Sequence, residues 1–269
     1  MKIGLSAAAF YGLMETEEQA AYIRRFPIDT CEIFLETHCE YTKSFGELVR
    51  EKLGDMHCTS VHPKGTQFEP DIFARSMHQY HDGMKAFRGV LDSAQAIGAK
   101  YYVMHGPHSV SSRMTIDRIH QLQPRFAEMA GEAAEKGIEL LYENVCWAAL
   151  RTTDDVARLT ELLPDIHFVL DIKQAQRAGV DPFDMLHAMG SRIRHVHLLD
   201  WDEQGRVCLP GQGCFDFPRL FDEMHQMDYD GTFLLEPYTT PPERENELLE
   251  ALSYLRKTAK QAYGKPHRT

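Results

Sequence analysis

The chain has 269 residues, of which 43% are hydrophobic and 26% are charged, and its formal net charge is −11. This ordinary globular balance excludes a mainly disordered chain, and no stretch approaches the roughly 18 consecutive apolar residues of a membrane span. The acidic charge argues against a nucleic-acid partner, because phosphate contacts dominate the affinity of nucleic-acid-binding proteins and call for a basic surface.

Strand-like and helix-like segments alternate along the chain. Short apolar, β-branched or aromatic runs predict strands at residues 2–6, 30–36, 58–62, 101–105, 139–143, 167–171, 194–199 and 232–236. Most of these runs are continuous rather than alternating, as expected for parallel strands covered on both faces. Eight β–α units in a chain of this length favour a closed (β/α)8 barrel, the TIM barrel of the α/β class, over an open doubly wound sheet. We expect one barrel domain over residues 1–264 and a short tail at 265–269.

Helical patterns fill the intervals between these runs. The spacing of Thr16 and Gln19 is that of a capping box and predicts the start of the first helix. A long helical pattern covers residues 71–97, and Gly98 is placed to end it in a left-handed conformation. Pro124 is expected to break or kink the next helical pattern. In the last helix, apolar residues recur at three- and four-residue steps and form one stripe: Leu248, Leu252, Leu255, Ala259 and Ala262.

Metal-binding residue types recur at or near the ends of the predicted strands. They are Glu36, His62, His105, Glu143, Asp171, His197 and Glu236. Any one of them alone would more often be a solvated loop residue. In a barrel, however, the C-terminal strand ends meet at one mouth, where active sites lie. Carboxylates that converge there after apolar runs repel one another unless a cation or protons neutralise them, so the pattern predicts a bound metal ion. His195, two residues before His197, is assigned to the barrel core.

Several motifs at these strand ends resemble the xylose isomerase-like barrel superfamily. They are SVHP, VMHGP, LYEN, VLDIKQA, HVHLLD, LPGQGCFDF and LLEPY, in this order along nearly the whole chain. The superfamily holds sugar isomerases and epimerases, and also the endonuclease IV type of DNA repair enzyme. The resemblance implies that Glu143, Asp171, His197 and Glu236 form the metal site.

The chain departs from two branches of this superfamily. The endonuclease IV type would place a second metal at His62, His105 and Glu143. Its third metal needs a histidine where Gln174 stands and an Asp-x-His pair in the region that reads QGRVCLPGQG. The ketose 3-epimerase type also has a histidine at the position of Gln174, with an arginine closer to the strand-seven histidine than Arg206 is. The general isomerase and epimerase branch, which includes inosose dehydratase-like members, tolerates such variation.

The resemblance also implies a mechanism. Three carboxylates and one imidazole are mostly hard ligands, so we expect Mn²⁺, with Mg²⁺, Co²⁺ or Zn²⁺ as alternatives. Such a cation chelates a sugar carbonyl and its neighbouring hydroxyl and stabilises an enediolate. Glu143 and Glu236 would be the catalytic pair, one removing a proton and the other returning it. Further side chains are predicted to bind or orient the sugar substrate: Lys173, Gln174, Arg206, Trp147 and Tyr238, with His62 and His105 either as substrate ligands or as a second metal position.

The sequence therefore predicts a metal-dependent isomerase or epimerase of a sugar, sugar phosphate or cyclitol. A dehydratase of the inosose dehydratase type, a zinc phosphodiesterase of the endonuclease IV type, and a non-catalytic barrel stay open as alternatives. The six cysteines form no C-x-x-C pair, and several lie inside apolar runs, which favours free thiols. With no convincing signal peptide in MKIGLSAAAFYG, we expect a cytoplasmic protein without a membrane partner. The sugar and the possibility of a homo-oligomer stay open.

Overall fold

The predicted strands form one closed parallel barrel in the computed structural model, which describes residues 1–108 and 113–267. The barrel strands are β1 (Lys2–Ser6), β2 (Thr30–Leu35), β3 (Cys58–Pro63), β4 (Tyr101–Met104), β5 (Glu139–Glu143), β6 (His167–Asp171), β7 (Ile193–Leu198) and β10 (Thr232–Leu235). Their order around the ring is β1-β10-β7-β6-β5-β4-β3-β2, and β1 pairs with β10 to close it. The fold is a (β/α)8 TIM barrel, as predicted.

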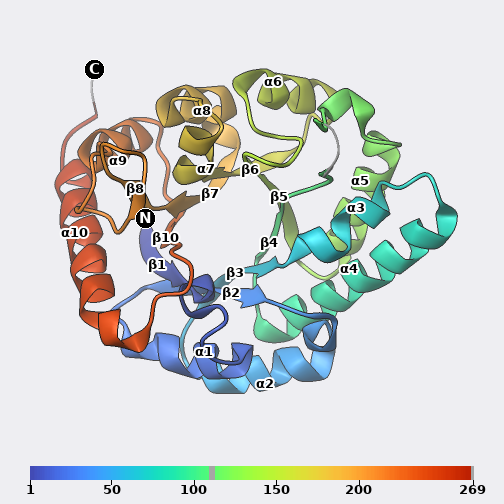
Figure 1. The fold of residues 1–269 in the computed structure, drawn as a ribbon, viewed down its shortest axis with the longest axis horizontal. Helices are drawn as coiled ribbons and strands as arrows, with labels where there is room; N and C mark the ends of the chain where they lie inside the picture. Colours follow the sequence, from blue (N-terminus) through green and yellow to red (C-terminus); the bar gives the residue numbers. More distant parts are fainter. Residues whose placement is uncertain (109–112, 268–269) are drawn as a thin grey trace.

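Helices surround the barrel on its outside (Figure 1). They are α1 (Thr16–Tyr22), α2 (Lys43–Leu53), α3 (Glu69–Ile72), α4 (Met77–Ile97), α5 (Leu122–Glu135), α6 (Thr153–Leu162), α7 (Ile172–Arg177), α8 (Pro182–Met189), α9 (Phe217–Gln226) and α10 (Glu245–Tyr263). Short 3₁₀ helices cover Ala7–Phe10, Ile23–Arg25, His38–Glu40, Gly65–Gln67, Ile116–Arg118, Gly190–Arg192 and Pro242–Arg244. A separate antiparallel pair, β8 (Asp200–Trp201) and β9 (Val207–Cys208), follows β7.

Both faces of the barrel wall are buried, which explains the continuous apolar runs. All residues of β2 and β3 are buried, including the polar ones. The apolar stripe predicted for the last helix is buried on α10 against this wall: Leu248, Leu252, Leu255, Ala259 and Ala262. Within the described ranges, none of the helices has the length and apolar character that crossing a membrane requires.

Two predictions about helix interiors were wrong, whereas the predicted helix end at Gly98 is confirmed. The expected helix over residues 71–97 is two helices: the Arg125 guanidinium binds the carbonyl oxygens of Ile72 and Ala74 where α3 ends, and the Ser76 side chain caps the start of α4 by accepting from the Gln79 N–H. Gly98 does end α4 with a φ of 86°. Pro124 neither breaks nor kinks α5, because it lies in the first turn, where its missing N–H leaves no hydrogen bond unmade.

The capping box of α1 is one residue earlier than predicted. It is formed by Glu15 and Glu18, whose side chains accept from each other's backbone N–H. Gln19 is buried instead and donates to Glu36 Oε1 at 2.7 Å, which draws Glu36 toward α1. Of the predicted tail, Lys265 and His267 pair with Asp222 and Asp228, while residues 268–269 lie outside the described part of the chain.

Candidate metal centre and active site

Six adjacent strands bring predicted metal-binding side chains to the C-terminal mouth of the barrel. In ring order these side chains are His62 on β3, His105 after β4, Glu143 on β5, Asp171 on β6, His197 on β7 and Glu236 after β10. All are buried except His105, whose side chain is 12% exposed. Glu36 does not join them, and no metal-ligating group found in the described residues includes it.

Glu143, Asp171, His197 and Glu236 form a compact set of ligand atoms. One atom from each lies within 4.8 Å of the others. His197 Nδ1 is 2.7 Å from Glu143 Oε1 and 3.6 Å from Glu236 Oε2. Asp171 Oδ2 is buried and has no hydrogen-bond partner among the described residues, although the Lys173 ammonium lies 3.3 Å away. Three oxygen donors and one nitrogen donor, with an unsatisfied carboxylate oxygen among them, fit a divalent cation such as Mn²⁺ or Zn²⁺.

His62 and His105 form a second group with Glu143. Their two Nε2 atoms are 2.9 Å apart, and they lie 3.3 and 2.9 Å from Glu143 Oε2. The group meets the spacing expected of metal ligands. Glu69, which the sequence interpretation missed, positions this corner by accepting hydrogen bonds from the backbone N–H groups of His105 and Gly106.

The electrostatics of the mouth indicate an excess of negative charge. Burial would raise the pKa of Glu143, but His197, together with His105 and His62, holds it well below its usual range. Burial would lower the pKa of His197, yet the surrounding carboxylates hold it well above its ordinary value. Burial raises the pKa of Asp171 to about 6, with Lys173 opposing the rise. Protons and one ammonium therefore supply the positive charge that a bound cation would bring.

Asn144, within the LYEN motif, fixes the position of Asp171. Its side-chain amide donates to the Asp171 carbonyl oxygen at 2.8 Å and accepts from the Asp171 N–H at 2.9 Å. The Asp171 side chain in turn caps α7 by accepting from the Gln174 N–H at 2.8 Å. The strand ends of β5 and β6 and the start of α7 are thus held as one unit beneath the site.

A cavity of about 380 Å³ opens above the candidate metal-binding side chains. It is lined by residues that include Trp147, Lys173, Gln174, Arg177, Glu236 and Tyr238. Trp147 stands edge-to-face against the His105 ring and is 40% exposed. Lys173 is buried and bridges Asp171 and Glu236 at 3.3 Å each.

The cavity also distinguishes two arginines. Arg206 was predicted to orient the substrate, but its guanidinium pairs with Asp202 at 2.7 Å, its side chain is 77% exposed, and it does not line this cavity. Arg177 was not predicted and does line it. Arg177 lies one helical turn after Lys173 on α7, a spacing that could have identified it.

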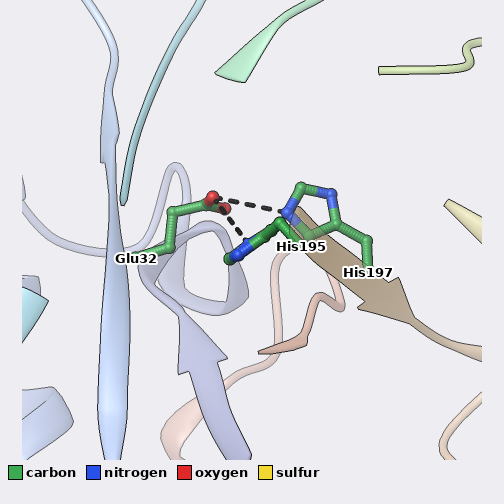
Figure 2. A group of neighbouring side chains, drawn as sticks. All are labelled: Glu32, His195 and His197. Carbon is green, nitrogen blue, oxygen red and sulfur yellow. Dashed lines mark hydrogen bonds and ion pairs between the residues drawn. The ribbon is translucent and has the colours of Figure 1, made fainter. Parts of the chain in front are cut away.

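The sequence interpretation also missed Glu32 on β2. Figure 2 shows its carboxylate facing the imidazoles of His195 and His197, with a dashed line to each ring. Glu32 Oε2 lies 3.3 Å from His197 Nε2 and 3.5 Å from His195 Nε2, and both the carboxylate and the rings are fully buried. His195 is a core residue, as assigned from the sequence. The three side chains also have the spacing of a metal-ligating group.

A closed parallel barrel with metal-binding side chains gathered at the C-terminal ends of its strands is the architecture of a barrel enzyme. The family described as "Xylose isomerase-like TIM barrel" matches residues 29–258, and the chain belongs to this family. The family confirms the resemblance seen in the sequence motifs.

The curated relatives include enzymes named inosose dehydratase. The one from Geobacillus kaustophilus is 27% identical over 191 residues, which is 59% of this chain and 62% of the relative. The one from Clostridium beijerinckii is 25% identical over 129 residues, 40% of this chain and 43% of the relative. The matches thus span less than two thirds of the length of these relatives.

Solved structures share the fold over almost the whole chain. The 3-keto-D-glucoside 4-epimerase from E. coli aligns with a TM-score of 0.73 and 18% identity, covering 96% of this chain and 99% of that one. D-psicose 3-epimerase gives a TM-score of 0.75 and 14% identity, with coverages of 98% and 100%. The IOLI protein with a bound zinc atom gives 0.72 and 17%, with coverages of 98% and 98%. At these identities the likeness establishes the fold alone.

Proposed function

We propose that this protein is a divalent-metal-dependent isomerase or epimerase that transfers a proton next to the carbonyl group of a sugar, sugar phosphate or cyclitol ketone. One observation supports this most directly. Glu143 and Glu236, from strands β5 and β10, both line the same cavity, and Asp171 and His197 stand on the two strands between them. A ketone bound there has a carboxylate on each flank, which removal and return of a proton require.

Four residues would hold the cation: Glu143, Asp171, His197 and Glu236. A bound divalent cation would polarise the substrate carbonyl and lower the barrier to losing the adjacent proton. Glu143 and Glu236 each offer a carboxylate oxygen to that proton, one as base and the other as acid. Lys173 at 3.3 Å and the Tyr238 hydroxyl at 3.4 Å hold Glu236 in place.

The remaining cavity residues suit a polyhydroxylated molecule. The exposed Trp147 ring offers an apolar face on which a sugar ring can stack, while Lys173, Gln174 and Arg177 offer donors from α7. His62 and His105 either bind substrate hydroxyls or hold a second cation with Glu143. Mn²⁺ is the proposed cation, because most donors of the first site are carboxylate oxygens.

A dehydratase is the second candidate, because the curated relatives carry the name inosose dehydratase. Dehydration of a hydroxylated ketone begins with the same step, removal of the proton beside the carbonyl, and then expels the hydroxyl one carbon further. The two candidates share the site and differ only in the fate of that hydroxyl.

The test is a panel of ketoses, inososes and their phosphates with Mn²⁺ in D₂O. Deuterium should appear at the carbon next to the carbonyl, and Glu143→Gln should stop the exchange. Products of unchanged mass apart from deuterium indicate isomerisation or epimerisation, and loss of water indicates dehydration. Turnover without exchange, with a shielded internal transfer excluded by labelled substrate, would contradict the proposal.

A further inference from the structure

Glu32 is a buried carboxylate that the proposed mechanism does not use. It lies on β2, and its Oε2 is within 3.3 Å of the Nε2 atom of His197, the imidazole in the proposed cation site. We infer that Glu32 is a positioning residue of the metal centre: it binds the Nε2–H of His197 and thereby leaves the Nδ1 lone pair for the cation. This inference rests on the metal centre of the proposed function.

The surroundings of Glu32 make it a hydrogen-bond acceptor. The Ser6 hydroxyl lies 2.9 Å from Oε1 and the Ser60 hydroxyl 2.7 Å from Oε2, and both serines are buried. A carboxylate has no proton to give, so each hydroxyl must donate to it. The two serines come from the strands on either side of β2 and hold the carboxylate in one orientation.

The His197 ring spans two layers of the barrel. Its Nε2 faces Glu32 inside the barrel, and its Nδ1 faces Glu143 at 2.7 Å and Glu236 at 3.6 Å at the mouth. A neutral imidazole has one N–H and one lone pair. Because the buried Glu32 can only accept, Nε2 keeps its proton when a cation replaces the proton on Nδ1, and the Nδ1 lone pair then points into the cation site. A carboxylate behind a metal-binding histidine fixes the tautomer and ring orientation in this way.

Glu32, His195 and His197 could instead hold a cation of their own inside the barrel. Two observations favour the positioning role. The oxygens of Glu32 already receive the two serine hydroxyls as well as His197. His195 lies farther off at 3.5 Å and packs its ring edge-to-face on His197, with centroids 4.9 Å apart. His195 thus acts as a packing partner that keeps the His197 ring from turning.

The first measurement uses the intact wild-type protein. It is labelled with ¹⁵N-histidine, loaded with Zn²⁺, and examined by long-range ¹H–¹⁵N NMR, with His197 assigned from the signals that His197→Gln removes. The proton should be on Nε2 and the metal-shifted nitrogen should be Nδ1. A protonated Nδ1, or a metal-bound Nε2, would overturn the inference while leaving the cation site in place.

The second measurement is Mn²⁺ and Zn²⁺ affinity by calorimetry in Glu32→Gln. We expect a loss of roughly 10- to 100-fold, typical of removing an outer carboxylate partner. The control is Glu40→Gln, another buried glutamate close after β2, which belongs to none of the candidate metal-ligating groups of the described residues and accepts a hydrogen bond from the Glu36 N–H. Its affinity should match the wild type.

The remaining outcomes distinguish the positioning role of Glu32 from the proposed metal-dependent function. Equal affinity in Glu32→Gln and wild type overturns the positioning role alone. A fall in stoichiometry by one ion in Glu32→Gln overturns it in favour of an interior cation. A wild-type protein that binds neither Mn²⁺ nor Zn²⁺ overturns the proposed function as well. Should Glu32→Gln fail to fold, the wild-type NMR measurement still decides.

Discussion

At the residue scale, Glu236 serves three neighbours at once. Its carboxylate lies 3.3 Å from Lys173, 3.4 Å from the Tyr238 hydroxyl and 3.6 Å from His197 Nδ1. Glu236→Gln keeps the volume but removes a charged ligand and one member of the proton-transferring pair. We expect the affinity for Mn²⁺ to fall. We also expect the turnover number to fall by about 10²- to 10⁴-fold, the usual contribution of a positioned acid or base. Calorimetry, circular dichroism and kinetics measure these effects, with the exposed Glu243→Gln as the control. Metal binding and turnover equal to the parent would show that the site is assigned wrongly.

Lys173 provides the second residue-scale prediction. Its buried ammonium lies between Asp171 and Glu236, so Lys173→Met leaves two buried carboxylates without their cation. Removing one partner from a buried ion pair costs about 3–5 kcal/mol. We expect the metal-free variant to unfold at a lower urea concentration than the wild type, and added Mn²⁺ to narrow that difference.

The control for Lys173 is a lysine of the same chain that pairs on the surface. Lys43 is 76% exposed and forms an i,i+4 pair with Glu47, so Lys43→Met should change stability by less than about 1 kcal/mol. Equal stability of Lys173→Met and Lys43→Met without metal would contradict the buried ion pairs of Lys173. If Mn²⁺ stabilised Lys173→Met no more than it stabilises the wild type, a bound cation would not replace the charge of the missing ammonium.

At the scale of elements, α7 connects the metal centre with the cavity. Asp171 caps the helix, and the spacing of Lys173, Gln174 and Arg177 turns all three toward the cavity. We predict that Arg177→Ala raises KM for a phosphorylated or carboxylated substrate by roughly tenfold, one lost charge-assisted hydrogen bond, with little effect on a neutral analogue. Arg206→Ala is the matched comparison, because Arg206 pairs with Asp202 outside the cavity. A rise in KM seen only in Arg206→Ala would indicate that Arg206, the residue predicted from the sequence, binds the substrate.

The comparison of β2 with the other strands shows where sequence patterns lose information. Its run was predicted to end in a mouth residue, Glu36, yet the strand ends at Leu35, and the carboxylate that lies beside His197 is that of Glu32. A strand buried on both faces has no polar–apolar alternation, so nothing along the sequence marks which side chains point into the barrel. The role of Glu32 depends on Ser6, Ser60 and His197, which only the closed barrel brings together.

The functional residues of strands β5, β6 and β7 were easier to predict from the sequence. There an apolar run ends directly in a carboxylate, or has a histidine next to its last residue, and both are costly to bury without a partner. Glu143, Asp171 and His197 could therefore be placed at the mouth from their sequence positions, and the structure groups them with Glu236. Helix boundaries were less accurate, since the carbonyl oxygens freed between α3 and α4 bind Arg125, a partner about fifty residues further along the chain that local sequence does not reveal.

At the scale of the whole molecule, closure of the barrel brings candidate metal ligands from motifs far apart in the sequence to one mouth. Residues as distant as His62 and Glu236 approach to 4.0 Å because their strands end at the same mouth. The same closure brings His62, His105 and Glu143 together, which is also what a zinc phosphodiesterase of the endonuclease IV type would need. The fold alone therefore does not distinguish a sugar enzyme from a phosphodiesterase. The choice between these two functions depends on the third metal position and on the net charge of the molecule.

Both of these features argue against DNA cleavage. Gln174 stands where the third metal would need a histidine, and its side-chain oxygen accepts the Cys146 N–H at 3.3 Å. The net charge of −11 opposes approach to a polyanion, because phosphate binding relies on lysine and arginine fields. We predict that a supercoiled plasmid with abasic sites is not nicked at a meaningful rate by the Zn²⁺- or Mn²⁺-loaded protein, as measured on agarose gels against a known abasic-site nuclease. Rapid zinc-dependent incision that His105→Ala abolishes would reverse this conclusion, because it would show that two metal positions suffice and that the cavity accepts a phosphodiester.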